Sequence, residues 1–220
     1  MRINIAIDGP SAAGKSTIAD ILASKLNYTH LDTGAMYRSI AFEAIKENIP
    51  LDAEDEVVEM INRIDLDMKE DGRIFLNGED ISSLIRTNEI SMAASDVSKL
   101  KNVRKALVAM QQRIASKGGY ILDGRDIGTV VLTDAPVKIY MIASAEARAS
   151  RRVIQNKEKN IEGNYETILE EIKKRDYQDS HRENSPLKKA DDALEIDTSD
   201  MTIEEVIEKV MSHVNKVIGE

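Results

Sequence analysis

Cysteine and tryptophan are absent from the sequence, and only two phenylalanines occur among its 220 residues. The lack of cysteine excludes a disulfide framework, a thiolate nucleophile and a zinc site with cysteine ligands. No apolar run approaches the roughly 18 residues of a membrane span, and an N-terminus containing Arg2 and Asp8 does not resemble a signal peptide. We therefore expect a cytoplasmic protein with an aliphatic core and no membrane partner.

Positive charge is also scarce. The 30 Lys and Arg residues are outnumbered by 39 Asp and Glu residues, and the formal net charge is −9. Such a chain is not a general binder of nucleic acids, so any anionic ligand must be held in a local basic pocket. The three histidines (His30, His181 and His213) are isolated in the sequence and lack metal-ligand spacing. We expect each to be exposed or satisfied by ordinary hydrogen bonds.

Short apolar runs alternate with helical periodicity at both ends of the chain. Residues 2–8 form an alternating, β-branched run, and a helical pattern over 15–26 follows the break at Gly9-Pro10. This order of elements is typical of a parallel α/β layer. The further expected strands are 28–32, 120–123, 137–142 and 194–197, and the further expected helices are 34–48, 144–156, 165–182 and one that begins after a Thr202-x-x-Glu205 capping box.

The middle of the chain has a different character. Asp71-Gly72 lies between two short apolar runs, 65–69 and 73–77, and this pair is a strong hairpin signal. Asn77-Gly78 suggests a second turn. Helical patterns flank these runs at 53–64, 89–98 and 102–117. We therefore expect a small antiparallel insert within one domain that spans residues 1–220.

The strongest motif is Gly9-Pro-Ser-Ala-Ala-Gly14-Lys15-Ser16, which matches the phosphate-loop pattern between a predicted strand and a predicted helix. Glycines let the backbone wrap around phosphates, the lysine adds a positive charge, and the Ser16 hydroxyl suits Mg²⁺. A glycine-rich turn that merely caps a helix is the structural alternative. No D-x-x-G motif is present, and Asn156-Lys-Glu-Lys159 fails the N-K-x-D pattern of guanine-nucleotide switches. The residues expected to surround phosphates are Gly9, Pro10, Ser11, Ala12, Ala13, Gly14, Lys15, Ser16 and Thr17.

Two further groups follow predicted strands, at the edge where open α/β sheets bind ligands. Asp32-Thr33 begins one of them, and these residues alone do not separate a helix cap from a ligand contact. Asp123 ends a hydrophobic strand, where a carboxylate orients Mg²⁺ or its waters in phosphate-loop proteins. An ordinary Asp-Gly turn is the alternative at that position, and we favour the functional interpretation.

Charged residues extend the inward face of the predicted helix 165–182. Ile168 and Ile172 mark that face, and Arg175, Asp179 and Arg182 continue it toward the C-terminus. Buried guanidinium groups need anions beside them, so this stripe predicts a cleft that holds anionic ligands. Arg148, Arg151 and Arg152 precede a charged connection at 157–164 and are either solvated or close to phosphates.

Longer motifs resemble those of bacterial cytidylate kinases over almost the whole chain. They are Asp32-Thr-Gly-Ala-Met-Tyr-Arg38, Ile85-Arg-Thr87, Ala93-Ala-Ser95, Asp123-Gly-Arg-Asp-Ile-Gly-Thr-Val-Val131, Asp134-Ala-Pro-Val-Lys-Ile139, Glu171-Ile-Lys-Lys-Arg-Asp176 and Ala190-Asp-Asp-Ala193. One departure is Ala12, where many members of that family have glycine. The resemblance implies a three-layer α/β/α P-loop fold with a nucleotide-binding insert at about 57–95 and a lid at about 155–164. It also implies Mg²⁺-dependent phosphoryl transfer from ATP to CMP or dCMP, which gives ADP and the diphosphate, by a monomer.

The resemblance assigns roles to individual residues. For CMP, it implies cytosine contacts from Thr33, Ser95, Arg104 and Asp126, acceptor-phosphate contacts from Arg38, Arg125 and Arg182, sugar contacts from Arg175 and Asp179, and a further contact from Tyr37. For ATP, it implies contacts from Arg148 and Arg151. It implies catalytic roles for Lys15, Asp123, Arg125, Arg152 and Arg182. A dense set of inward arginines suits two charged nucleotides held face to face, and an acceptor phosphate needs no general base. A kinase of UMP, AMP or shikimate and a non-catalytic nucleotide-binding protein remain as alternatives.

Overall fold

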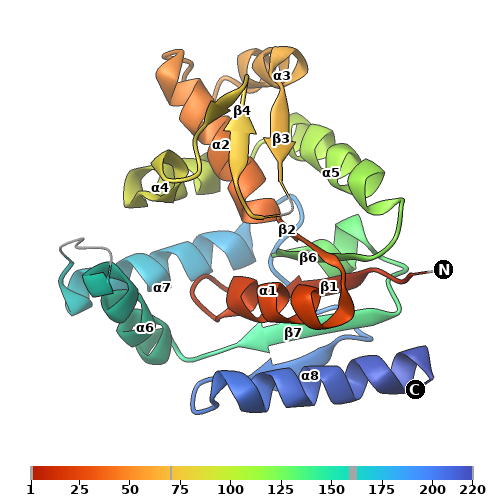
Figure 1. The fold of residues 1–220 in the computed structure, drawn as a ribbon. Helices are drawn as coiled ribbons and strands as arrows, with labels where there is room; N and C mark the ends of the chain where they lie inside the picture. The colour runs from red at the N-terminus through yellow and green to blue at the C-terminus, as the bar shows by residue number, and fades with distance from the viewer. Residues whose placement is uncertain (1, 70, 159–162, 220) are drawn as a thin grey trace.

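The centre of the molecule is a five-stranded sheet in the order β2-β6-β1-β7-β8, in which every strand is parallel to its neighbours (Figure 1). The computed structural model describes residues 2–69, 71–158 and 163–219. All four residues of β1 are buried, as is usual for a parallel strand with helices on both faces. The strands are β1 (Ile5–Asp8), β2 (Thr29–Asp32), β6 (Tyr120–Gly124), β7 (Val137–Ile142) and β8 (Leu194–Asp197).

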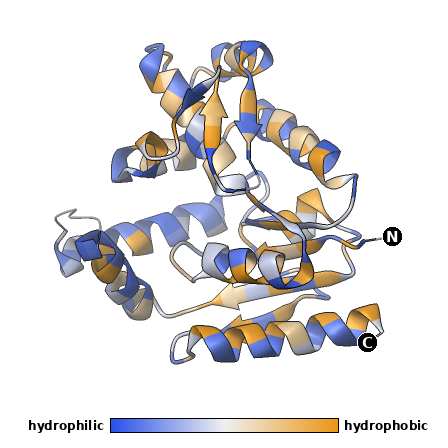
Figure 2. Ribbon diagram, in the orientation of Figure 1, coloured by the Kyte–Doolittle hydropathy of each residue, from blue (hydrophilic) through white to orange (hydrophobic). Residues whose placement is uncertain are grey.

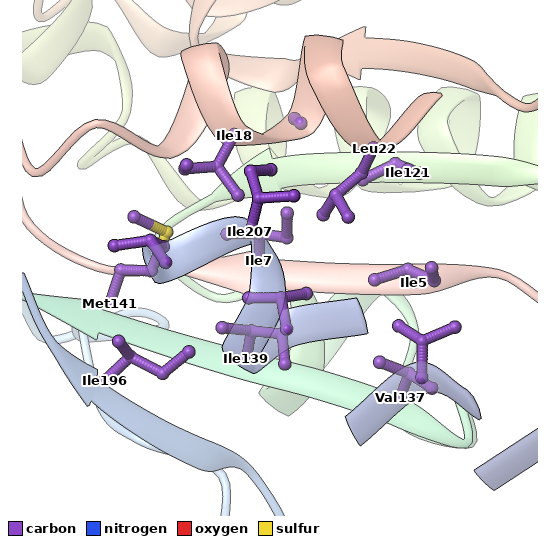
Figure 3. Packing of buried hydrophobic residues seen from close by; sticks show 14 of the residues in the cluster. Ile5, Ile7, Ile18, Leu22, Ile121, Val137, Ile139, Met141, Ile196 and Ile207 are labelled. Atoms are coloured by element: carbon purple, nitrogen blue, oxygen red, sulfur yellow. The ribbon is translucent and has the colours of Figure 1, made fainter. Parts of the chain in front are cut away.

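Helices cover both faces of this sheet. On one face, α1 (Lys15–Leu26) and α8 (Ile203–Ile218) pack on the aliphatic side chains of the strands, several of which Figure 3 shows. On the other face lie α2 (Thr33–Lys46) and α5 (Lys101–Ala115). The three-layer α/β/α fold is therefore confirmed. The capping box at Thr202 is present as expected at the start of α8.

The middle segment forms a small unit beside α2 (Figure 1). It contains α3 (Glu54–Arg63), an antiparallel sheet of β3 (Leu66–Met68), β4 (Ile74–Leu76) and β5 (Glu79–Asp80), a short 3-10 turn (Leu84–Arg86) and α4 (Asn88–Val97). Asn77 and Gly78 both have positive φ, 50° and 83°, which is the backbone of a tight two-residue turn. The antiparallel insert is thus confirmed, although the sequence patterns did not predict the two-residue strand β5.

Two helices, α6 (Ala145–Glu158) and α7 (Tyr165–His181), extend beyond the carboxyl ends of the strands (Figure 1). Their shared apolar contact is small and centres on Ala149, Ile168 and Ile172. Figure 2 shows that α7 is largely hydrophilic. The expected lid, 155–164, begins within the last turn of α6, and its central residues 159–162 lie outside the described part of the chain.

Two expectations about secondary structure need correction. The first strand begins at Ile5 rather than Arg2, because pairing with β6 and β7 starts there. The segment after Asp126 forms a short π-helical turn (Ile127–Val131) for which no element was expected. In the described residues, no helix has the length and apolar character needed to cross a membrane.

Candidate active site

A cavity of about 770 Å³ opens at the carboxyl ends of the parallel strands. The phosphate loop and α1 line one side, and the start of α2, the end of β6 and the inner face of α7 line the other. Its volume lies at the upper end of the range typical of ligand pockets. The cavity contains predicted residues from both sides: Ser11, Ala12, Ala13, Gly14, Lys15, Ser16, Thr17, Thr33, Tyr37, Arg38, Ser95, Arg104, Asp123, Arg125, Asp126, Arg151, Arg152, Arg175, Asp179 and Arg182.

The backbone of the phosphate loop needs residues that tolerate positive φ. Gly9 has φ 148°, and a Cβ there would lie 2.0 Å from the Met141 carbonyl oxygen, so no side chain fits. Gly14 has φ 91° and ends the loop at the start of α1. Ala12 also has positive φ, at 58°. The departure from glycine at this position therefore keeps a left-handed backbone, at a cost of about 1–2 kcal/mol for a residue with a Cβ.

Lys15 is the buried cation of this loop. Its side chain is only 6% exposed, and Nζ donates a hydrogen bond to the Pro10 carbonyl oxygen at 2.7 Å. Burial, reinforced by the nearby charge of Arg125, lowers the pKa of Lys15 to about 7. A phosphate anion placed beside the amine would restore its charge. The loop is thus electrostatically incomplete without an anion.

A chain of polar side chains leads from the phosphate loop to β2. Ser16 Oγ donates to Asp123 Oδ2 at 2.9 Å, and His30 Nε2 lies 2.8 Å from Asp123 Oδ1. The other ring nitrogen of His30 lies 2.6 Å from Asp20 Oδ1. Although burial alone would lower it, the two carboxylates, Asp123 first, raise the pKa of His30 to about 10. His30 is therefore satisfied by hydrogen bonds as expected, and its partner Asp123 lines the cavity.

Ser16 and Asp123 fit a magnesium ion. Both offer oxygen, and Mg²⁺ in kinases is bound by one or two protein oxygens together with phosphates and waters. A cage built entirely of protein side chains is not expected for such an ion. The described ranges contain no group of three or more His, Asp or Glu side chains arranged to bind a metal.

On the other side of the cavity, acidic side chains orient several of the arginines. Arg104 forms an ion pair with Asp126, whose second oxygen lies 3.5 Å from the guanidinium of Arg182. Arg125 Nε donates to Asp179 at 2.7 Å. All five side chains line the cavity. The inward stripe predicted on α7 is therefore confirmed for its charged members.

At the start of α2, the helix cap is confirmed, whereas the ligand contact of Asp32-Thr33 stays a prediction. Asp32 caps the helix by accepting from the Ala35 backbone N–H, and it also accepts from Arg38 at 2.7 Å. Thr33 Oγ1 donates to the Asp123 carbonyl oxygen at 2.7 Å, which ties β2 to β6. Arg38 and Thr33 nevertheless line the cavity as well. The helix cap thus aims these side chains at the ligand space.

Several polar atoms in this part of the cavity are buried without a protein partner. Among the described residues they are Tyr37 Oη, Arg38 Nε, Arg104 Nε and Arg175 Nε, and the terminal nitrogen of Arg182 that lies 3.5 Å from Asp126 also makes no hydrogen bond. Burial, together with the charge of Arg125, lowers the pKa of Arg175 to about 10. Buried donors without acceptors are costly to a protein. Such a cluster of donors therefore calls for an anionic, acceptor-rich ligand.

Two side-chain hydrogen bonds join the insert to α7 across the cavity. Ser95 Oγ donates to Gln178 Oε1 at 3.3 Å, and Asn88 Nδ2 donates to Glu171 Oε1 at 3.0 Å. Ser95 is buried and lines the cavity, whereas the Asn88 contact is exposed. The insert therefore borders one side of the cavity and is joined to α7 by weak hydrogen bonds.

The three arginines of α6 differ in position. Arg148 does not line the cavity: its guanidinium donates to Asp176 at 2.9 Å and to the Ser11 carbonyl oxygen at 3.3 Å. Arg151 lines the cavity and donates to Thr198 Oγ1 at 3.1 Å. Arg152 also lines it, and within the described residues it pairs with no carboxylate. The expected contact of Arg148 with ATP stays a prediction. In this structure Arg148 contacts the phosphate loop through the Ser11 carbonyl oxygen, outside the cavity lining.

A parallel sheet, a phosphate loop opening a helix, and a second set of buried arginines facing that loop define a phosphate-loop kinase. The sequence profile of the family described as "Cytidylate kinase" matches residues 5–216. Proteins named cytidylate kinase from Bacillus cereus and Bacillus thuringiensis are each 49% identical over 221 residues, covering 99% of this chain and 98% of theirs. The chain belongs to the cytidylate kinase family and is a nucleoside monophosphate kinase.

One solved structure has the same fold at low sequence identity. An uncharacterised protein from Eubacterium ventriosum matches with a TM-score of 0.54 and 14% identity, covering 98% of this chain and 99% of that one. This likeness concerns the fold alone. The roles of individual residues toward ATP and CMP therefore rest on the geometry described above.

Proposed function

We propose that the protein transfers the γ-phosphoryl group of ATP to CMP or dCMP, with Mg²⁺, and forms ADP and the corresponding diphosphate. A phosphate oxygen of the acceptor forms the new P–O bond as the bond between the γ-phosphorus and the β,γ-bridging oxygen breaks. ADP takes the electron pair of that bond. The attacking oxygen is already ionised, so no side chain has to remove a proton.

One observation carries this proposal: a single cavity has the phosphate loop on one side and the unpartnered arginine donors on the other. A donor and an acceptor phosphate bound to these two groups would face each other. Lys15 would hold the β- and γ-phosphates, and Arg125, Arg152 and Arg182 would neutralise charge between the nucleotides. Catalysis then consists of positioning and electrostatic stabilisation. Mg²⁺ held by Ser16 and Asp123 would supply further neutralisation of the phosphate charge.

The pair Arg104–Asp126 supports cytosine as the base. Cytosine presents an amino donor beside two acceptors, which suits a carboxylate next to a guanidinium. Uracil places a carbonyl oxygen opposite Asp126 and an N–H opposite Arg104. Each mismatch leaves a buried polar group unpaired at about 1–3 kcal/mol, so the two together favour CMP over UMP by roughly 10²–10⁴ in kcat/KM.

The test is an acceptor screen with ATP and Mg²⁺ against CMP, dCMP, UMP, AMP and shikimate. We expect turnover with CMP and dCMP, and little ADP formation without an acceptor. Steady ATP consumption that no acceptor stimulates, or a preference for another acceptor, would contradict the proposal. Asp126→Ala then separates base selection from loop shaping. Selection by Asp126 requires the CMP/UMP ratio of kcat/KM to narrow by about tenfold or more, whereas a proportional loss with both acceptors assigns Asp126 to the ion pair with Arg104 alone.

A further inference from the structure

The helical turn that follows Asp126 is capped by a residue from another strand. Asp8, the last residue of β1, accepts hydrogen bonds from the backbone N–H groups of Ile127 and Gly128, each at 2.7 Å. One carboxylate oxygen serves each N–H. Asp8 is only 4% exposed and immediately precedes Gly9 of the phosphate loop. These are the first two N–H groups of the turn Ile127–Val131, which need acceptors from outside it.

Asp126 stands at the position where an aspartate normally supplies that cap. A side chain there accepts from N–H groups of the first turn, and aspartate is among the residues preferred for it. In this protein the Asp126 side chain makes no such hydrogen bond. Its oxygens face Arg104 and Arg182 in the cavity instead. Asp8 occupies the Gly128 N–H, one of the two N–H groups from which a side chain at this position ordinarily accepts, while the Asp126 carboxylate stays directed at the cavity.

We propose that Asp8 is a positioning residue for acceptor selection, because its cap on Ile127 and Gly128 keeps the Asp126 carboxylate turned toward the base. This inference rests on the proposed function, since it assumes that Asp126 reads cytosine. It also joins the two halves of the site, because Asp8 continues directly into the loop expected to hold ATP. Asp8 itself is not expected to touch either nucleotide.

The surroundings of Asp8 fit a carboxylate retained for this purpose. Burial raises the pKa of Asp8 to about 6, although the N–H groups of Gly128 and Ile127 act in the opposite direction. A Cβ at Gly128 would lie at an ordinary contact distance of 3.4 Å from Asp8 Oδ2, and its tighter neighbour would be Lys138 Cδ at 3.2 Å. Asp8 and Asp126 are both buried, at 4% and 5% exposed, so each carboxylate needs its own hydrogen-bond partners.

Asp8→Asn tests the inference with little change in shape. The amide has a single acceptor oxygen, and its NH₂ group faces the second backbone N–H, so one N–H is released for Asp126. We expect the ratio of kcat/KM for CMP to kcat/KM for UMP to fall by about fivefold. This factor corresponds to the free energy typically lost when an N-cap is removed. The change should appear mainly as a higher KM for CMP, with the KM for ATP within about twofold of wild type. A merely structural role predicts a proportional loss with both acceptors, and that result would overturn the inference.

A double-mutant comparison makes the test specific. In an Asp126→Ala background, Asp8→Asn should leave the CMP/UMP ratio unchanged, because no carboxylate remains to be misdirected. A further narrowing in that background would also overturn the inference. Glu43→Gln is the matched control, since Glu43 is 5% exposed and does not line the cavity. It should leave the ratio as in wild type. Asp8→Ser, which keeps one acceptor in a smaller side chain, replaces Asp8→Asn if the latter does not fold.

The outcomes separate this inference from the proposed function. A wild-type enzyme that prefers another acceptor over CMP contradicts both, whereas one that uses UMP as readily as CMP contradicts base selection by Asp126 and, with it, the role of Asp8. If the wild-type enzyme prefers CMP by at least about tenfold and Asp8→Asn leaves the CMP/UMP ratio of kcat/KM unchanged, only the role of Asp8 is contradicted. A narrowed ratio in Asp8→Asn that disappears in the Asp126→Ala background supports it.

Discussion

Replacing Lys15 with methionine should make the ligand-free protein more stable while it weakens ATP binding. The lysine is 6% exposed, and its burial together with the charge of Arg125 lowers its pKa from 10.5 to about 7. Each pKa unit corresponds to about 1.36 kcal/mol, so at pH 7.5 keeping this amine in the folded protein costs about 4 kcal/mol. Methionine has no such cost. It loses the hydrogen bond to the Pro10 carbonyl oxygen, worth about 1 kcal/mol, and leaves that oxygen unpaired.

We therefore expect Lys15→Met to raise the free energy of unfolding by about 1–3 kcal/mol at pH 7.5 without nucleotide. The folded state favours the neutral amine, so the cost of Lys15 is complete below pH 7 and declines as the pH rises toward 10.5. The stability difference should accordingly shrink between pH 7.5 and about pH 9.5. Turnover should fall by about 10²–10³, because one electrostatic contact to the transferred group is lost.

The assay is urea unfolding at both pH values, with ATP binding measured by calorimetry. Lys138→Met is the matched control: Lys138 is 7% exposed, but it donates to the Thr133 carbonyl oxygen and to Asp192. That variant should lose about 1–2 kcal/mol of stability and bind ATP as wild type does. If Lys15→Met is less stable than wild type at pH 7.5, or if the difference is the same at both pH values, the electrostatic reasoning is wrong.

Two other substitutions probe the remaining parts of the site. Arg175→Met removes a buried guanidinium whose Nε has no hydrogen-bond partner among the described residues. The KM for CMP should rise by about tenfold or more, while the KM for ATP stays within about twofold of wild type. Steady-state kinetics with each nucleotide varied measures both values, and a rise of both together would contradict the acceptor-side role. His30→Gln gives up contacts with Asp20 and Asp123, so the melting temperature should fall by roughly 3–8 °C in calorimetry. His213→Gln on α8 serves as its control, and a fall no larger in His30→Gln than in His213→Gln would show that the His30 contacts contribute little.

The elements that the sequence predicted well are those specified by local patterns. The helix 15–26 and the strands 137–142 and 194–197 have the expected bounds, because apolar periodicity and flanking breakers determine them. The hairpin at Asp71-Gly72 and the cap at Thr202 also follow from short-range chemistry. Local consistency of this kind requires no knowledge of which strands pair.

The features that were missed depend on pairing between distant segments. His30 lies opposite Ile121 in the register of β2 and β6, so Asp123 is its diagonal neighbour on the same side of the sheet. A histidine two residues before Asp32 carries a signal only once those two strands are known to be adjacent. The cap from Asp8 likewise joins distant segments, because its partners Ile127 and Gly128 lie 119 and 120 positions further along the chain. The sequence thus predicted most of the residues that line the cavity, whereas it did not predict that His30 and Asp8 hydrogen-bond to that lining.

The two contacts between the insert and α7 have a kinetic consequence. Ser95–Gln178 is long and Asn88–Glu171 is exposed, so together they contribute about 1–2 kcal/mol. A free-energy difference of that size leaves these two hydrogen bonds open in roughly 3–15% of ligand-free molecules. Exchange of this kind takes microseconds to milliseconds in comparable domain motions. An acceptor nucleotide therefore does not depend on a rare opening event. Once bound, its own contacts to the insert and to α7 hold these two segments together.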